Sequence, residues 1–172
     1  MGAEFMLRAE ITKINTKSKC IKVTDPDGTA HKISYKTLIS DPSYFVDEKL
    51  VDCEVSKVKK EIIRCICICK KNPKAVGSRN VTFLAPNKKF DIFCVVLGPE
   101  TQAAPENYEI AILSTVKETE NIQQEIEFAI KKFDVVEFYV GTRVVYENSS
   151  KEVIFTENVD ESPLMDNIYE DI

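Results

Sequence analysis

Apolar and polar residues alternate along most of the chain, which is the pattern of half-buried β-strands. In the first half, this pattern predicts strands over residues 7–14, 18–25, 29–35, 50–58 and 61–69. The second and third of these strands flank Asp25-Pro26-Asp27-Gly28, which has the residues of a type I turn. The segment 36–48 loses the period of two and contains Pro42, so it predicts a short helix or 3₁₀ turn interrupted at Asp41-Pro42.

The same order of elements returns after the polar stretch 70–80, which contains Pro73 and Gly77. Strands are predicted over residues 81–85, 90–97, 108–114, 134–146 and 151–156. Residues 119–133 place apolar side chains at helical spacing, with glutamates early and lysines late, and predict an α-helix. Three strands, a helical segment and two strands therefore occur twice, which indicates an internal duplication.

This element order resembles that of OB-fold and S1-like modules. In the first half the resemblance also rests on Ile11-Thr12-Lys13-Ile14, Ile21-Lys22-Val23 and the 25–28 turn. The OB fold is a five-stranded Greek-key barrel. The resemblance implies a β-rich, all-β fold with one α-helix, arranged as two tandem OB-like five-stranded barrels. An SH3-like or extended-Tudor arrangement gives a similar list of strands and stays open.

The pattern also predicts where the segments meet. Residues 1–5 are interpreted as an expression scar before Met6, residues 6–72 as a basic barrel, 73–80 as a linker, 81–158 as an acidic barrel and 159–172 as an acidic flexible tail. No apolar run approaches the roughly 20 residues that a membrane helix needs, and no signal peptide precedes the first strand. We therefore expect an intracellular protein of the cytoplasm or nucleus that does not associate with membranes.

Composition agrees with a globular protein and adds a charge asymmetry. The 172 residues are 44% hydrophobic and 30% charged, with a net charge of −5. Residues 6–88 hold 17 basic and 9 acidic side chains, whereas residues 89–172 hold 6 and 18. This asymmetry suggests that the two halves face different partners or face each other.

The inventory of reactive residues argues against catalysis and against metal. The chain has one His, no glycine-rich phosphate loop and no nucleophile elbow, so we expect no enzyme, no catalytic residue and no cofactor. Cys65, Cys67 and Cys69 alternate with isoleucines, which places all three on one face of a strand. Because the spacing of zinc motifs is missing, we expect reduced, buried cysteines without metal.

Basic residues in the first half are candidates for nucleic-acid binding. OB-fold modules bind single strands through a basic groove and stacking aromatics, so the resemblance implies such a role for Lys13, Lys22, Lys32, Lys57, Lys59 and Lys60. No aromatic residue lies between Leu7 and Ser34, and phosphate contacts alone give weak, salt-sensitive binding. The alternative is that these lysines form an ordinary solvated surface.

Aromatic and apolar residues in the acidic half are candidates for a protein interface. Phe138 and Tyr139 are neighbours on a predicted strand, so one of them must leave the core side. Leu164 and Tyr169 lie in an acidic tail of the kind that folds on a partner. The leading prediction is a non-enzymatic adaptor in an intracellular, nucleic-acid-related assembly. The alternatives are a single-stranded DNA or RNA binder and an extended-Tudor-like methylarginine reader.

Overall fold

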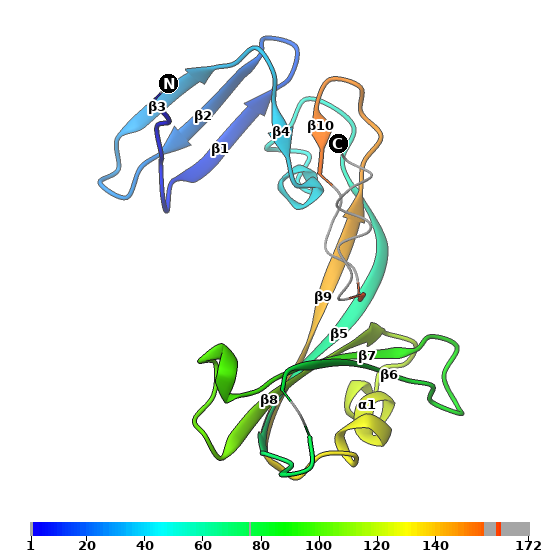
Figure 1. Ribbon diagram of the computed structural model, residues 1–172. Helices are drawn as coiled ribbons and strands as arrows, with labels where there is room; N and C mark the ends of the chain where they lie inside the picture. Colours follow the sequence, from blue (N-terminus) through cyan, green and yellow to red (C-terminus); the bar gives the residue numbers. More distant parts are fainter. Residues whose placement is uncertain (1, 76, 157–160, 163–172) are drawn as a thin grey trace. The chain divides into compact units, whose positions relative to one another are not determined.

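The computed structural model describes residues 2–75, 77–156 and 161–162 of the chain. It divides into two compact units (Figure 1). The first unit consists of Met1–Val58 and Tyr146–Asn158, and the second of Lys59–Val145 and Val159–Ile172. The division therefore lies near positions 58 and 145, whereas residues 73–80 fall within the second unit.

A three-stranded antiparallel sheet begins the first unit, formed by β1 (Glu10–Asn15), β2 (Cys20–Thr24) and β3 (Ala30–Ser34) in that order. The predicted turn at 25–28 joins β2 to β3. Its Gly28 has φ +84°, and its N–H donates to the carbonyl of Asp25 at 3.0 Å. A side chain is strained at such a φ, so glycine suits this position. The prediction of three strands and this turn is confirmed.

The remainder of the first unit packs around Phe45, which is fully buried. Strand β4 (Ile39–Ser40) precedes the 3₁₀ helix η1 (Pro42–Phe45), which the carboxylate of Asp41 caps by accepting from the N–H of Ser43 at 2.8 Å. Strand β10 (Ile154–Phe155) pairs in parallel with β4. The ring of Phe155 meets that of Phe45 edge-on, with 4.9 Å between centroids.

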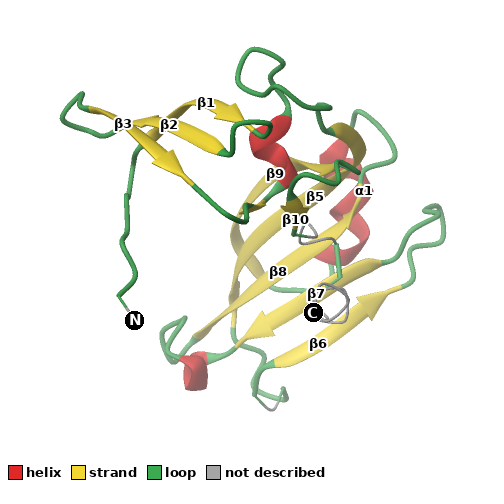
Figure 2. Cartoon of the chain, turned by 90° about the horizontal axis from the view of Figure 1, so that it is seen from above, coloured by secondary structure: helices red, strands yellow, loops and turns green. Residues whose placement is uncertain are grey.

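A five-stranded sheet dominates the second unit, with the strand order β6-β7-β8-β5-β9. Its strands are β5 (Lys57–Lys70), β6 (Arg79–Phe83), β7 (Ile92–Leu97), β8 (Tyr108–Val116) and β9 (Val135–Glu147), and the 3₁₀ helix η2 (Pro99–Thr101) follows β7. The helix α1 (Ile122–Ile130) packs against one face of the sheet (Figures 1 and 2).

The predicted helix is confirmed but shorter than expected at both ends: it ends at Ile130, and it begins after Asn121, whose side-chain oxygen accepts from the N–H of Gln124 at 3.2 Å. Ile126 and Ala129 of α1 are fully buried against the cysteine face of β5. Within the described residues, no helix has the length and apolar character needed to cross a membrane.

The prediction of two tandem OB-like barrels is wrong, because the sheets are open and β5 pairs outside its expected barrel. Lys59 and Lys60 do not form a hairpin, since β5 runs straight through them. Its later half pairs with β8, so that Cys65 lies opposite Leu113. The expected closing hairpin is also wrong, because β10 pairs with β4. Without separate barrels, the interpretation as an internal duplication fails as well.

Candidate functional site

Three of the expected basic residues form a row across the sheet of the first unit. The strand register places Lys22 directly opposite Lys13 on β1 and opposite Lys32 on β3. Lys13 donates from Nζ to the carbonyl of Lys49 at 2.9 Å, and within the described residues none of the three forms an ion pair with a carboxylate. Like charges directly opposite each other repel. This lysine row (Lys13, Lys22 and Lys32) therefore presents uncompensated positive charge to solvent.

The other three expected basic residues are not part of the lysine row. Lys57 belongs to the first unit and forms an exposed ion pair with Glu54 at 3.3 Å. Lys59 and Lys60 belong to the second unit, and Nζ of Lys60 lies 2.5 Å from the carboxylate of Glu161. The structure thus separates the six lysines, and two of these three already have acidic partners.

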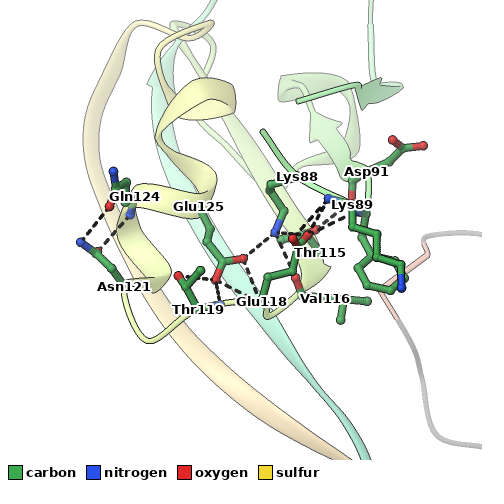
Figure 3. Close-up of polar contacts among 11 residues, drawn as sticks. Lys88, Lys89, Asp91, Thr115, Val116, Glu118, Thr119, Asn121, Gln124 and Glu125 are labelled. Atoms are coloured by element: carbon green, nitrogen blue, oxygen red, sulfur yellow. Dashed lines mark hydrogen bonds and ion pairs between the residues drawn. The ribbon is translucent and has the colours of Figure 1, made fainter. Parts of the chain in front are cut away.

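A buried charged cluster in the second unit escaped the sequence analysis (Figure 3). The side chain of Lys88 is only 6% exposed, and its ammonium lies 2.5 Å from the carboxylate of Glu125 and 2.9 Å from that of Glu118. It also donates to the carbonyl of Val116 at 3.2 Å. The carboxylate of Glu125, 5% exposed, accepts further hydrogen bonds from the N–H and hydroxyl of Thr119. The cluster therefore ties the loop after β6 to the start of α1.

A cavity of about 390 Å³ borders this cluster. It is lined by Ala85, Pro86, Asn87, Lys88, Glu118, Thr119, Gln124, Glu125 and Phe128. Burial raises the pKa of the Glu125 carboxyl, but the hydrogen bonds from Lys88 and Thr119 outweigh burial and leave the pKa below its usual value. Because the ammonium and this carboxylate are paired with each other and with the backbone, the cluster has the character of a structural ion pair.

The sequence contains a signal for one of the buried charged residues, Glu109, but none for Lys88. Glu109 lies in register with the core-facing positions 111 and 113 of β8, where a charge requires a partner. That partner is Arg79, which donates two hydrogen bonds to the carboxylate at 3.0 and 3.1 Å. Lys88 gave no such signal, because it lies in a polar loop that reads as solvated surface.

Phe138 and Tyr139 face opposite ways, as predicted. Phe138 packs against the core of the second unit, whereas Tyr139 is 58% exposed. The phenol of Tyr139 donates to the carboxylate of Glu137 at 2.6 Å, and this hydrogen bond raises the pKa of the phenol. Leu164 and Tyr169, the other expected partner-binding residues, lie outside the described residues.

The cysteines of β5 lie where the alternation predicted them. Cys65, Cys67 and Cys69 are fully buried on the face that packs against α1, and the exposed Ile66 points to the other face. Burial raises the pKa of Cys69 to about 12. Within the described part of the chain, no group of three or more His, Cys, Asp and Glu side chains is arranged to hold a metal ion.

Comparison with known proteins identifies similarities over the whole chain. The family model described as GDP dissociation inhibitor matches residues 1–172. The chain is 29% identical over 141 residues to Rab GDP dissociation inhibitor beta of Canis lupus familiaris, which is 79% of this chain and 30% of that protein. It superposes with a TM-score of 0.74 on the crystal structure of Rab GDI from Plasmodium falciparum, at 20% identity, over 95% of this chain and 38% of that one.

These findings correct two predictions. The resemblance to OB-fold and S1-like modules is wrong, because one family model spans both halves and the fold is that of the Plasmodium falciparum protein. The function as an adaptor of a nucleic-acid-related assembly is wrong for the same reason, and nothing supports a nucleic-acid partner or a methylarginine reader. The chain spans about a third of the length of the relatives it matches.

Proposed function

The chain belongs to the GDP dissociation inhibitor family, and from this premise we propose that it binds a Rab GTPase in the GDP-bound state and slows the release of GDP. The observation that carries the proposal is the family match over the whole chain. Rab is the GTPase named for both the canine relative and the solved Plasmodium falciparum protein. A protein that slows nucleotide release must bind the GDP complex more tightly than it binds the transition state through which GDP leaves.

Such a function requires binding and no covalent chemistry. A dissociation inhibitor makes and breaks no covalent bond, which agrees with the expectation that the chain is not an enzyme. The buried carboxylate that lines the 390 Å³ cavity, Glu125, is already paired with Lys88 and Thr119. A protein partner was expected from the sequence, and the family match supports a partner of that kind.

The lysine row is the surface to which we assign the GTPase contact. Lys22 lies between two other lysines in the register, and these three ammonium groups lack carboxylate partners within the described residues. An acidic patch on the GTPase would relieve their mutual repulsion, so binding at this surface gains electrostatic free energy that an ordinary surface does not offer. Complementary charge also accelerates association and makes it sensitive to salt.

A nucleotide-release assay tests the proposal. A Rab GTPase is loaded with a fluorescent GDP analogue, unlabelled nucleotide is added in excess, and the release rate is followed at increasing concentrations of this chain. We expect release to slow to a plateau. The double variant Lys22→Glu/Lys32→Glu should raise the concentration needed for half the effect by about tenfold or more.

The matched control is Lys57→Glu/Lys59→Glu, which changes the net charge by the same amount outside the lysine row. It should inhibit release almost as well as the unmodified chain. If saturating amounts of the unmodified chain leave the release rate unchanged, the proposed function is wrong. If both double variants inhibit equally well, the function stands and the assignment to the lysine row fails.

A further inference from the structure

One face of the sheet in the second unit is apolar at its centre and has no helix of the described residues over it. Helix α1, the one α-helix of the described residues, packs on the opposite face against Cys65, Cys67 and Cys69 (Figure 1). Side chains alternate between the faces of a strand, so the residues between these cysteines point away from α1. On β7 and β8, the residues between the buried core positions Cys94, Val96, Ala111 and Leu113 likewise point away from α1.

The register arranges these outward side chains into rows. Ile66 on β5 lies opposite Ile112 on β8, which lies opposite Val95 on β7. In the same way Ile68, Ile110 and Leu97 form a second row. With Phe93 they make up what we call the open face: Ile66, Ile68, Phe93, Val95, Leu97, Ile110 and Ile112.

These seven side chains remain partly exposed to solvent. Ile66 is 47% exposed, and the other six are half-buried. None of the seven packs against the buried core of the unit. On β9, Phe138 and Val140 pack against this core, and the exposed Tyr139 lies between them in the sequence. Alternation along β9 therefore places Tyr139 on the same side of the sheet as the open face.

An ordinary solvated sheet face is polar, whereas the centre of this one is apolar, and the register places its polar residues, Arg64, Ser114, Asn80 and Thr82, around the seven. The solvent side of an antiparallel sheet normally alternates polar residues with the apolar residues of the core side. Strand β7 reads Ile-Phe-Cys-Val-Val-Leu without a polar residue, a pattern typical of strands buried on both faces. Contiguous apolar patches of this kind mark interaction sites.

We propose that the open face is the docking surface for a part of a GDP dissociation inhibitor polypeptide that lies outside the region this chain matches. The alignment with the canine relative includes 79% of this chain but only 30% of that protein, and the superposition on the Plasmodium falciparum structure includes 95% of this chain but only 38% of that one. Most of such a protein thus lies outside this region and supplies the surface that the open face requires. Its contacting side chains are apolar and uncharged, since the seven residues offer no polar partner. Tyr139 lies at the rim of the contact.

Cysteine labelling tests the proposal without reference to GTPase binding. Ile66→Cys and, as a control, Leu84→Cys are made in a Cys53→Ser background, and their rates of reaction with a maleimide are measured in the folded chain. Leu84 is 73% exposed and follows β6 outside the open face. The same two variants are then measured in a chimera, in which this chain replaces the superposed segment of the Plasmodium falciparum Rab GDI.

We expect Ile66→Cys to react readily in the isolated chain and about tenfold or more slowly in the chimera, with Leu84→Cys unchanged between the two. Equal rates at position 66 in both proteins would overturn the proposal. If the chimera does not fold, cysteines are introduced into the intact Plasmodium falciparum protein at the positions that superpose on Ile66 and Leu84. Rapid labelling at the first of these would overturn the proposal, and slow labelling there with rapid labelling at the second supports it.

A second copy of this chain is the competing occupant. In that case, labelling of Ile66→Cys in the isolated chain would slow as the chain concentration rises, and Ile66→Glu would convert a dimer into a monomer in light scattering. Either result would overturn the proposal in favour of self-association. The labelling experiment measures packing and the nucleotide-release assay measures GTPase regulation. Either proposal can therefore be refuted while the other stands.

Discussion

Replacing Glu125 by alanine should destabilise the second unit, because it breaks a buried ion pair. The change removes the closest partner of the Lys88 ammonium, which is 6% exposed. Breaking a buried pair by removing one partner costs about 3 to 5 kcal/mol of unfolding free energy. Lys88 retains Glu118 at 2.9 Å and the carbonyl of Val116 at 3.2 Å. We therefore expect a loss near the lower limit, about 3 kcal/mol.

Urea denaturation followed by circular dichroism measures this loss, and thermal unfolding checks it. For a protein of this size, 3 kcal/mol corresponds to a decrease in Tm of about 6 to 12 °C. The matched control is Glu127→Ala on the same helix, whose exposed carboxylate pairs with Lys131 at 2.8 Å. Exposed pairs of this type contribute about 0.5 kcal/mol or less. A loss below about 1 kcal/mol for Glu125→Ala would refute the structural role of the cluster.

The pH dependence of stability, compared between the unmodified chain and Glu125→Gln, gives an independent test. Hydrogen bonds from Lys88 hold the pKa values of Glu118 and Glu125 below their usual range despite burial. A carboxyl with a lowered pKa in the folded state stabilises the fold above its unfolded pKa of about 4.3, and this contribution is lost as pH falls through the folded value. The unmodified chain should therefore lose stability below about pH 4 more steeply than Glu125→Gln does.

Three further outcomes are expected. Arg79→Met should lower the free energy of unfolding by about 3 kcal/mol in urea denaturation, because it leaves the buried carboxylate of Glu109 unpaired; a change within 0.5 kcal/mol, roughly that of an exposed position, would contradict this. Glu137→Gln should lower the pKa of Tyr139 in an ultraviolet titration, since the hydrogen bond from the phenol to the Glu137 carboxylate raises that pKa; an unchanged titration would show that this hydrogen bond does not form. Cys69 should react with a thiol reagent at pH 8 only after unfolding, because burial raises its pKa to about 12, and mass spectrometry of labelled peptides would reveal any reaction in the folded state.

The sequence predicted the local structure well where one residue type decides it. Gly28 completes a turn that was predicted from its four residues and that the structure shows with positive φ at this position. Alternation also predicted correctly that Cys65, Cys67 and Cys69 share a buried face. Each of these inferences depends on neighbours in the sequence, so the surrounding fold does not change the answer.

Strand pairing could not be predicted in the same way, because alternation determines which face a side chain takes and not which strand lies beside it. The predicted strands 50–58 and 61–69 leave Lys59 and Lys60 as a turn between them, although lysine is not a turn-forming residue. The structure shows that β5 continues through both residues. The short strand β10 pairs with β4, which is more than one hundred residues away in the sequence. These two errors in strand pairing are sufficient to explain why two barrels were predicted where the sheets are open.

The candidate surfaces were missed or misread for the same reason. Lys13, Lys22 and Lys32 were named from their charge and the OB-fold resemblance, but only the register of β1, β2 and β3 shows that they lie side by side. The open face includes a strand without polar residues, Ile92–Leu97, but the apolar run alone does not show which side of the sheet the chain leaves uncovered.

The two proposed surfaces have opposite chemistry, and salt separates them. Contacts made through the lysine row should weaken as ionic strength rises, because exposed charges are screened beyond about 8 Å at physiological salt. Contacts made through the open face contain no charge, and salts such as sulfate strengthen apolar burial. Inhibition of GDP release by this chain should therefore decline with added salt, whereas protection of position 66 in the chimera should be maintained. If both effects decline together, the open face is covered by a charged partner, and the assignment of an apolar occupant is wrong.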